Sequence, residues 1–227
     1  MSADRRRTIR SYASRPGRLT QGQRNAFERL WPRYGLEPVG SPLDLDALFE
    51  RQRPRVLEIG FGNGESLVAM AAAHVDTDFL GVEVHSPGIG HCLLLLEQLA
   101  LGNVRVLRGD ALDLLLCGFD GPAFQRIQIY FPDPWPKKRH HKRRLVRQDT
   151  VDLLTSRLLS GGQLHLATDW QQYAEDMLRL LESSAELRNL AGKNQFSGPR
   201  GDRPVTKFER RGRQLGHGVW ELLFERT

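Results

Sequence analysis

Hydrophobic and polar residues follow two different periods along the chain, and each period predicts one type of secondary structure. Short runs rich in β-branched, aliphatic and aromatic residues predict strands, whereas apolar residues that recur every three or four positions predict helices. The strands are expected at 55–59, 79–84, 104–107, 127–131 and 163–167. The helices that alternate with them are expected at 65–73, 89–100, 112–116, 146–159 and 170–181. This alternation indicates a mostly parallel sheet with helices on both faces.

The two ends of the chain depart from this alternation. Two late segments, 205–210 and 219–224, are separated by three glycines and predict a closing hairpin. The expected fold is therefore α/β: a Rossmann-like, doubly wound, mostly parallel seven-stranded sheet with an antiparallel C-terminal edge strand. Residues 185–201 show neither period. Residues 1–25 are polar and basic, and we expect a flexible N-terminal segment there, followed by a single domain at 26–227.

Charge is distributed unevenly along the chain. The net charge is +6, yet residues 1–18 carry +5, residues 137–144 carry +6 and residues 200–213 carry +4, so the remainder is acidic. If the three basic segments converge in space, they form a positive face of the kind that neutralises phosphates. For residues 1–18 a solvated arm is an equal alternative. For residues 137–144 the neighbouring motif favours a binding role.

Several classes of protein are disfavoured by what the sequence lacks. The histidines show no metal-ligand spacing, so no metal site is expected. The apolar run at 93–96 is far too short to span a membrane. Cys92 and Cys117 lack a CxxC spacing and have apolar neighbours, which predicts core positions in a reducing compartment. The N-terminus has no apolar signal core, and the expected location is the cytoplasm.

The most informative segment, 126–144, reads RIQIYFPDPWPKKRHHKRR. Its strand pattern stops at 132–136, where prolines pre-set the backbone on either side of Asp133. We therefore expect a rigidly held carboxylate beside Trp135 at the carboxyl end of a strand, the edge at which open α/β sheets bind ligands. Six basic residues follow directly in 137–144. This combination indicates chemistry on a group carried by a polyanion.

A glycine-rich turn follows the first expected strand. Its glycines at 60, 62 and 64 let the backbone approach a ligand closely, and their spacing differs from the dinucleotide fingerprint GxGxxG. Acidic residues lie at the ends of three successive strands: Glu58, Glu83 and Asp110. A carboxylate at Glu83 can accept both hydroxyls of a ribose, and Asp110 can receive the exocyclic amine of adenine. The alternative, that acids favour the helix N-termini after strands, explains one of the three well and all three poorly.

Together the motifs resemble a known family. VLEIGFGNGESL, FLGVEVHSPGIG, YFPDPWPKKRHHKRRL, HLATDWQQYAEDML and PVTKFERRGRQLGHGVWELLFER are similar, in order and spacing, to the bacterial tRNA (guanine-N7)-methyltransferases, which are class I S-adenosylmethionine-dependent enzymes. The resemblance runs from about Ile9 to the C-terminus. It implies methyl transfer from S-adenosylmethionine to N7 of the variable-loop guanine, position 46 of tRNA, which leaves 7-methylguanosine and S-adenosylhomocysteine. It also implies tRNA as partner and a monomer or homodimer without an obligatory protein partner.

The resemblance also assigns site residues, carried over position by position. The implied cofactor contacts are Glu58, Gly60, Gly62, Gly64, Glu83, Asp110 and Asp133. The implied substrate contacts are Lys137, Asp169, Thr206, Lys207, Phe208 and Glu209. The implied RNA contacts are Arg139, His140, His141, Lys142, Arg143 and Arg144. The implied catalytic acid is Asp133.

The chemistry of guanine N7 defines what Asp133 is expected to do. N7 carries an in-plane lone pair and no proton at neutral pH, so transfer depends on in-line positioning, and Asp133 is expected to orient the base and offset the growing positive charge. Two other functions compete with this interpretation. An amino-methyltransferase acting on another nucleic acid would place Asn/Asp/Ser-Pro-Pro-aromatic where this chain has Pro-Asp-Pro-Trp. A non-catalytic RNA-binding module is expected to have lost the strand-end acids that are present here.

Overall fold

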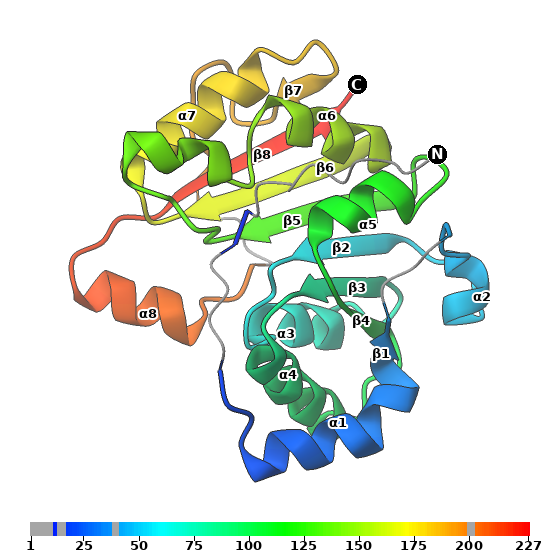
Figure 1. Ribbon diagram of the computed structural model, residues 1–227. Helices are drawn as coiled ribbons and strands as arrows, with labels where there is room; N and C mark the ends of the chain where they lie inside the picture. The colour runs from blue at the N-terminus through cyan, green and yellow to red at the C-terminus, as the bar shows by residue number, and fades with distance from the viewer. Residues whose placement is uncertain (1–10, 13–16, 38–40, 199–202) are drawn as a thin grey trace, which may run out of the picture.

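The computed structural model describes residues 11–12, 17–37, 41–198 and 203–227, so most of the basic segment 1–18 lies outside the described residues. In the described part, eight strands form one sheet in the order β1-β4-β3-β2-β5-β6-β8-β7 (Figure 1). The strands are β1 (Gly35–Leu36), β2 (Arg55–Ile59), β3 (Asp78–Glu83), β4 (Val104–Arg108), β5 (Phe124–Tyr130), β6 (Leu158–Thr168), β7 (Leu187–Asn189) and β8 (Trp220–Arg226). The pairs from β1 through β6 are parallel, whereas β8 is antiparallel to both β6 and β7.

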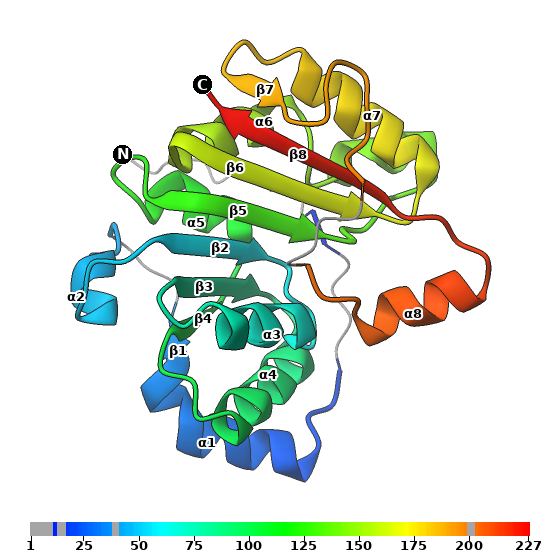
Figure 2. The ribbon, with the colours of Figure 1, turned by 180° about the vertical axis from the view of Figure 1, so that it is seen from behind.

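Helices cover both faces of the sheet, as the alternating pattern predicted. They are α1 (Gln21–Tyr34), α2 (Leu45–Phe49), α3 (Glu65–Ala73), α4 (Ser86–Gln98), α5 (Ala111–Cys117), α6 (Gln148–Arg157), α7 (Gln171–Glu182) and α8 (Lys207–Gln214), with a short 3₁₀ helix η1 (Lys138–Arg143). Helices α1, α3 and α4 build one buried apolar cluster with strands β2 to β4. Helices α5, α6 and α7 build a second cluster on the opposite face. The fold is therefore the expected doubly wound α/β architecture (Figures 1 and 2).

The C-terminal hairpin is the main error of the sequence-based prediction. Residues 205–210 do not form a strand, because Thr206 caps the helix α8 by accepting a hydrogen bond from the Glu209 amide at 3.3 Å. The sequence of α8 is charged nearly all round, which suits a solvent-exposed helix and not a buried strand. Strand β8 is antiparallel, as expected, but it does not form the edge because β7 pairs outside it. With β1 and β7 the sheet has eight strands, not seven.

Smaller differences concern the chain termini and one cysteine. Helix α1 begins at Gln21 with a capping box at Thr20, so the expected boundary at residue 25 falls inside a helix. Cys92 is buried as expected, whereas Cys117 is exposed at the end of α5, contrary to the prediction. No helix in the described ranges is long and apolar enough to cross a membrane.

Candidate active site

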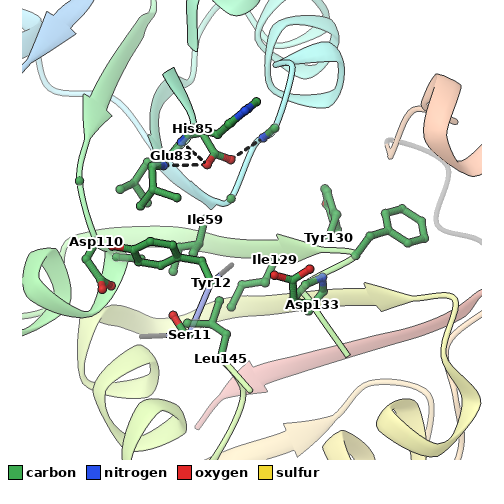
Figure 3. A pocket seen from close by; sticks show the side chains of 18 residues that line it. Ser11, Tyr12, Ile59, Glu83, His85, Asp110, Ile129, Tyr130, Asp133 and Leu145 are labelled. Carbon is green, nitrogen blue, oxygen red and sulfur yellow. Dashed lines mark hydrogen bonds between the residues drawn. The ribbon is translucent and has the colours of Figure 1, made fainter. Parts of the chain in front are cut away.

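A pocket of about 390 Å³ opens at the carboxyl ends of the parallel strands β2 to β5 (Figure 3). Its lining includes Gly60, Gly62, Glu83, Asp110 and Asp133, five of the residues singled out from the sequence. In the view of Figure 3, Asp110 and Asp133 lie toward opposite sides of the pocket, with Glu83 on the far wall. The parallel strands bring these residues together because their carboxyl ends share one edge of the sheet.

Glu83 fixes the shape of one wall of this pocket. It is nearly buried at the end of β3, and its Oε2 accepts a hydrogen bond from the Gly62 amide at 2.9 Å. Its Oε1 accepts from the amides of Val84 and His85 at 2.7 and 2.9 Å. The carboxylate thus ties the glycine-rich turn after β2 to the loop after β3. Charge-assisted bonds of this kind are about twice as strong as neutral ones, so the two loops are held as one unit.

Glu58 and Gly64 lie outside the residues that line the pocket. Glu58 is buried on β2, where it accepts a hydrogen bond from Gln128 Nε2 at 2.6 Å. Burial raises the pKa of Glu58 to about 7, against a smaller opposing effect of the Gln128 hydrogen bond. Gly64 begins α3 with a positive φ of 81°, and a Cβ there would lie 2.6 Å from the side chain of Cys92 on α4. Both residues thus hold the glycine-rich turn in place without lining the pocket.

Asp110 and Asp133 sit on elements that restrict their motion. Asp110 is the N-cap of α5 and accepts a hydrogen bond from the Leu112 amide at 2.9 Å, so the helix-terminus role weighed from the sequence does apply to it. Asp133 lies between Phe131 and Trp135, whose φ values are 53° and 44°. Positive φ at bulky residues costs on the order of 1–3 kcal/mol each and persists only where the surroundings enforce it. The Pro-Asp-Pro turn is therefore held in a strained conformation next to the pocket.

Arg144 supplies part of that enforcement. Its side chain is buried, and its Nε donates a hydrogen bond to the Pro134 carbonyl at 2.8 Å. Its Nη1 pairs with Asp176 of α7 at 2.6 Å, and the guanidinium lies 4.5 Å from the centroid of the Tyr173 ring. Arg144 thus differs from the other basic residues of 137–144, because its side chain lies inside the protein against the Pro-Asp-Pro turn.

The remaining basic residues of 137–144 point outward along η1. Lys137, Lys138, Arg139, Lys142 and Arg143 are exposed, and His140 and His141 are half-buried. Partial desolvation, and then the charges of Arg139 and Arg143, lower the pKa of His140. Arg143 lies 5.0 Å from the centroid of the Trp135 ring, so the positive surface begins directly beside the Pro-Asp-Pro turn.

Helix α8 brings the predicted segment 206–209 to the same edge but gives its members different roles. The Lys207 amide donates to Glu65 Oε2 at 2.7 Å, and the exposed Phe208 ring lies 5.2 Å from that of Phe131, centroid to centroid. Glu209, in contrast, is buried in ion pairs. The described residues of the segment 200–213 therefore meet those of 137–144 around the Pro-Asp-Pro turn.

Asp169 lies apart from the pocket. It lines a second, shallower hollow between α7 and the start of β8, where its Oδ2 is 3.5 Å from His217 Nδ1. Trp170 and Trp220 complete the walls of this hollow. The sequence placed Asp169 at a strand end correctly, but the strand order sets it farther along the sheet edge than Asp133.

Two contributors to the pocket were missed from the sequence. Ser11 and Tyr12 line it, and the Ser11 carbonyl accepts a hydrogen bond from Trp135 Nε1 at 3.4 Å. Figure 3 shows the Tyr12 ring lying across the pocket between Asp110 and Ile129. The only sequence signal was an aromatic residue inside a polar, basic segment, which gives no indication of where the segment lies.

Comparisons with known proteins agree with this geometry. Residues 52–222 match the family described as "Putative methyltransferase". A tRNA (guanine-N(7)-)-methyltransferase from Alkalilimnicola ehrlichii is 54% identical over 99% of this chain and 95% of its own length. Another, from Thiobacillus denitrificans, is 53% identical over 100% of both chains.

Solved structures share the fold at much lower identity. An rRNA methylase from Streptococcus thermophilus has a TM-score of 0.52 and 15% identity, covering 80% of this chain and 92% of its own. A structure described as "a putative methyltransferase from streptococcus mutans in complex with SAH" has a TM-score of 0.51 and 11% identity, covering 83% of this chain and 99% of its own. Identities this low establish the common architecture alone.

Proposed function

The chain belongs to the tRNA (guanine-N7)-methyltransferase family, and we propose that its carboxyl-edge pocket carries out the family's reaction at guanine 46 of the tRNA variable loop. One observation supports placing the reaction in this pocket. The Asp133 carboxylate is held in a strained, proline-locked turn between a pocket that suits the cofactor and a surface that suits phosphates. A carboxylate fixed at that junction can contact the transferring group and the base together.

The lining residues fit S-adenosylmethionine. Glu83 would hold the ribose hydroxyls, Asp110 the adenine amine, and the backbone of Gly60 and Gly62 would face the cofactor, since a Cβ added at either glycine meets nothing within 4 Å. When bound, the cofactor supplies an electrophilic methyl group on a sulfonium centre and leaves as S-adenosylhomocysteine. The proposal includes no metal ion, because that methyl group is already activated. Glu58 and Gly64 would act indirectly, by holding the turn.

The chain's own contribution to the reaction is placement and charge. Guanine N7 attacks without losing a proton, so orientation of the base can supply about 7–11 kcal/mol of the barrier reduction. Asp133 would orient the guanine and stabilise the positive charge that develops on its ring. Lys137 and Asp169, together with α8, would hold the nucleotide around this contact. No group is required to act as a general base.

The basic surface would position the tRNA without reading its sequence. The exposed basic residues of η1 would contact phosphates, and such contacts fix register and orientation. N7 faces the major groove, which in A-form RNA is too narrow for side chains, so the target guanine would be presented from a loop or lifted out of its stack. The half-buried Trp135 beside Arg143 offers one stacking surface. The enzyme would act in the cytoplasm and need no obligatory protein partner.

The test is mass spectrometry of nucleosides from unmodified tRNA incubated with the protein and S-adenosylmethionine. We expect 7-methylguanosine at position 46, and its loss in both Asp133→Ala and Asp133→Asn. The matched control is Asp76→Asn, because the Asp76 side chain is 90% exposed and lies at the amino ends of the strands. A different methylated base would favour the amino-methyltransferase, and RNA binding without any methylation would favour the binding module. An Asp133→Asn enzyme with most of its turnover would refute the role given to the carboxylate.

A further inference from the structure

Helix α8 stands beside the carboxyl ends of the strands, apart from the helix layers (Figures 1 and 2). Its first turn touches the body of the protein through the Lys207 amide on Glu65 and through Phe208 on Phe131. Within α8, Glu209 is the buried residue. A helix this polar has no apolar face to dock, so side-chain anchors must set its position.

Arg203 is the main anchor. Its side chain is only 3% exposed, and its Nη1 donates to Glu209 Oε2 at 2.6 Å. On the other side, its Nε and Nη2 donate to Glu221 Oε1 on β8 at 3.0 and 2.7 Å. The guanidinium also lies 5.6 Å from the centroid of the Phe131 ring, next to the Pro-Asp-Pro turn. One planar group therefore joins α8, the sheet and the strained turn.

The anchor continues into the sheet as a chain of hydrogen bonds that is buried at both ends and partly buried at Tyr130. From Glu221 Oε2 the chain reaches His165 Nε2 at 2.9 Å, and His165 Nδ1 lies 3.0 Å from the Tyr130 hydroxyl. The Tyr130 hydroxyl donates to Gln128 Oε1 at 3.2 Å, and Gln128 Nε2 donates to Glu58 at 2.6 Å. These residues lie on β8, β6, β5 and β2. Figure 2 shows β5, β6 and β8 side by side in the sheet, as their pairing requires.

Such a buried network resists deformation, because breaking one member leaves the others unpaired in a low dielectric. Both carboxylate oxygens of Glu209 are engaged inside the protein, Oε1 by Arg213 at 2.5 Å and Oε2 by Arg203 at 2.6 Å, and the residue is only 1% exposed. Its carboxylate is thus committed to holding the helix. The residues of α8 that remain directed to the site are those of its first turn, with Phe208 exposed next to Phe131.

We propose that Arg203 is a positioning residue for methyl transfer, which fixes α8 to the sheet through Glu209 and Glu221 and so places Phe208 against the Asp133 turn. This inference rests on the proposed function of the pocket. It assigns to Glu209 the role of an anchor, in place of a direct contact with the guanine. It also connects the two ends of the site, because the same hydrogen-bond chain ends at Glu58 behind the glycine-rich turn.

The test compares Arg203→Met with Arg188→Met. Arg188 also pairs with an acid of β8, Glu225, but its side chain is 63% exposed and it lies on β7, away from α8. The readout is the single-turnover rate constant for methylation of tRNA at saturating cofactor. We expect Arg203→Met to lower it about 30-fold or more, since misplacement by about 1 Å can cost on the order of 100-fold. Arg188→Met should stay within about threefold of the wild type, and Arg203→Lys should recover part of the rate because it restores the charge without the planar fork.

Two further readouts separate positioning from a general loss of structure. An unfolded fraction lowers the concentration of active enzyme but leaves the single-turnover rate constant unchanged as long as folded enzyme stays in saturating excess over tRNA. The affinity for S-adenosylmethionine should stay within about twofold. If Arg203→Met does not fold, Glu209→Gln tests the same anchor while the Arg203–Glu221 pair remains, and it should show the same fall in rate constant. A rate constant within threefold of the wild type in a folded Arg203→Met or Glu209→Gln enzyme would overturn the proposal, as would an equal loss in Arg188→Met.

Hydrogen exchange provides a test that does not depend on activity. In Arg203→Met the amides of 207–214 should exchange at least about tenfold faster, while those of β2 and α3 keep their rates, because opening would be local. Should the wild-type enzyme form no 7-methylguanosine, the proposed function would fail, and this exchange experiment would still decide whether Arg203 holds α8. Unchanged exchange in α8 would refute the anchor.

Discussion

The two halves of the carboxyl edge are built in different ways. On the cofactor side, between β2 and β4, main-chain amides converge on the Glu83 carboxylate, and short loops between parallel strands and helices fix the pocket. On the substrate side, between β5 and β8, ion pairs from segments far apart in the sequence do the same work. A main-chain amide is held in position by the backbone. An ion pair between side chains exists only while both charged partners are present. The cofactor half is therefore preorganised by the main chain, and changes that disturb its backbone or the Glu83 carboxylate should cost most. The substrate half should respond to the loss of single charges and to salt.

The largest expected loss of stability is at Gly64 in the cofactor half, where an added side chain has no space. Gly64→Ala combines a φ of 81° with a Cβ 2.6 Å from Cys92, so it should lower the free energy of unfolding by about 3 kcal/mol or more. Gly60→Ala is the matched control, with a φ of 73° and open space around the added Cβ, and should cost about 1 kcal/mol. Urea unfolding of both variants measures the difference. Equal losses would mean that helix packing behind the turn contributes nothing.

The next effect tests whether Glu83 organises the cofactor half. Glu83→Ala removes an acceptor for three backbone amides and should weaken S-adenosylmethionine binding about 100-fold, since charge-assisted hydrogen bonds contribute about 1.5–3 kcal/mol each. Isothermal titration calorimetry gives the affinity, and Glu28→Ala on the exposed side of α1 is the control. Binding of tRNA in the absence of cofactor should change little. An equal loss of tRNA affinity would show that Glu83 supports the substrate half as well as the cofactor half.

The third prediction concerns the pH dependence of stability and the role of Glu58 in it. Glu58 on β2 is joined to β5 by the Gln128 hydrogen bond. Because its pKa in the folded protein, about 7, lies above its ordinary value of 4.5, the native state binds this proton more tightly than the unfolded chain. The stability that protonation confers is complete below the ordinary pKa and is lost as the pH rises through about 7. Wild type should therefore lose about 2 kcal/mol relative to Glu58→Gln between about pH 5 and pH 8, measured by denaturant unfolding. Identical pH profiles would contradict the raised pKa.

The smallest effect should appear at the exposed end of the substrate half. The double variant Arg139→Ala/Lys142→Ala removes two phosphate contacts and should weaken tRNA binding about tenfold and reduce the slope of log affinity against log salt by about 1.5. Arg188→Ala/Lys193→Ala, which removes the same charge near β7 at the far edge of the sheet, is the control. Filter binding across a salt series measures both. An unchanged slope in the first variant would show that η1 does not contact phosphates.

Local patterns were sufficient for the architecture. The strands at 55–59 and 79–84 and the helix at 65–73 appear within a residue of where the pattern predicted them, because side-chain periodicity and glycine or proline breaks act over a few neighbouring residues. The same applies to the Pro-Asp-Pro turn, because its prolines restrict the backbone locally. The doubly wound topology then follows, since strand–helix alternation allows few other arrangements.

Contacts between distant segments could not be predicted in this way. Nothing in 205–210 indicated a helix held by Arg203, and nothing in the basic run distinguished the inward-facing Arg144 from its exposed neighbours. Sequence alone determined the five central parallel strands, β2 to β6, and the acids that stand at their carboxyl ends. Only the tertiary structure decided which of these acids meet in one pocket and which arginines are buried as anchors. The physical reason is that a buried charge is stable only beside its partners, and here the partners of Arg203 and Arg144 are supplied in part by other elements of the fold.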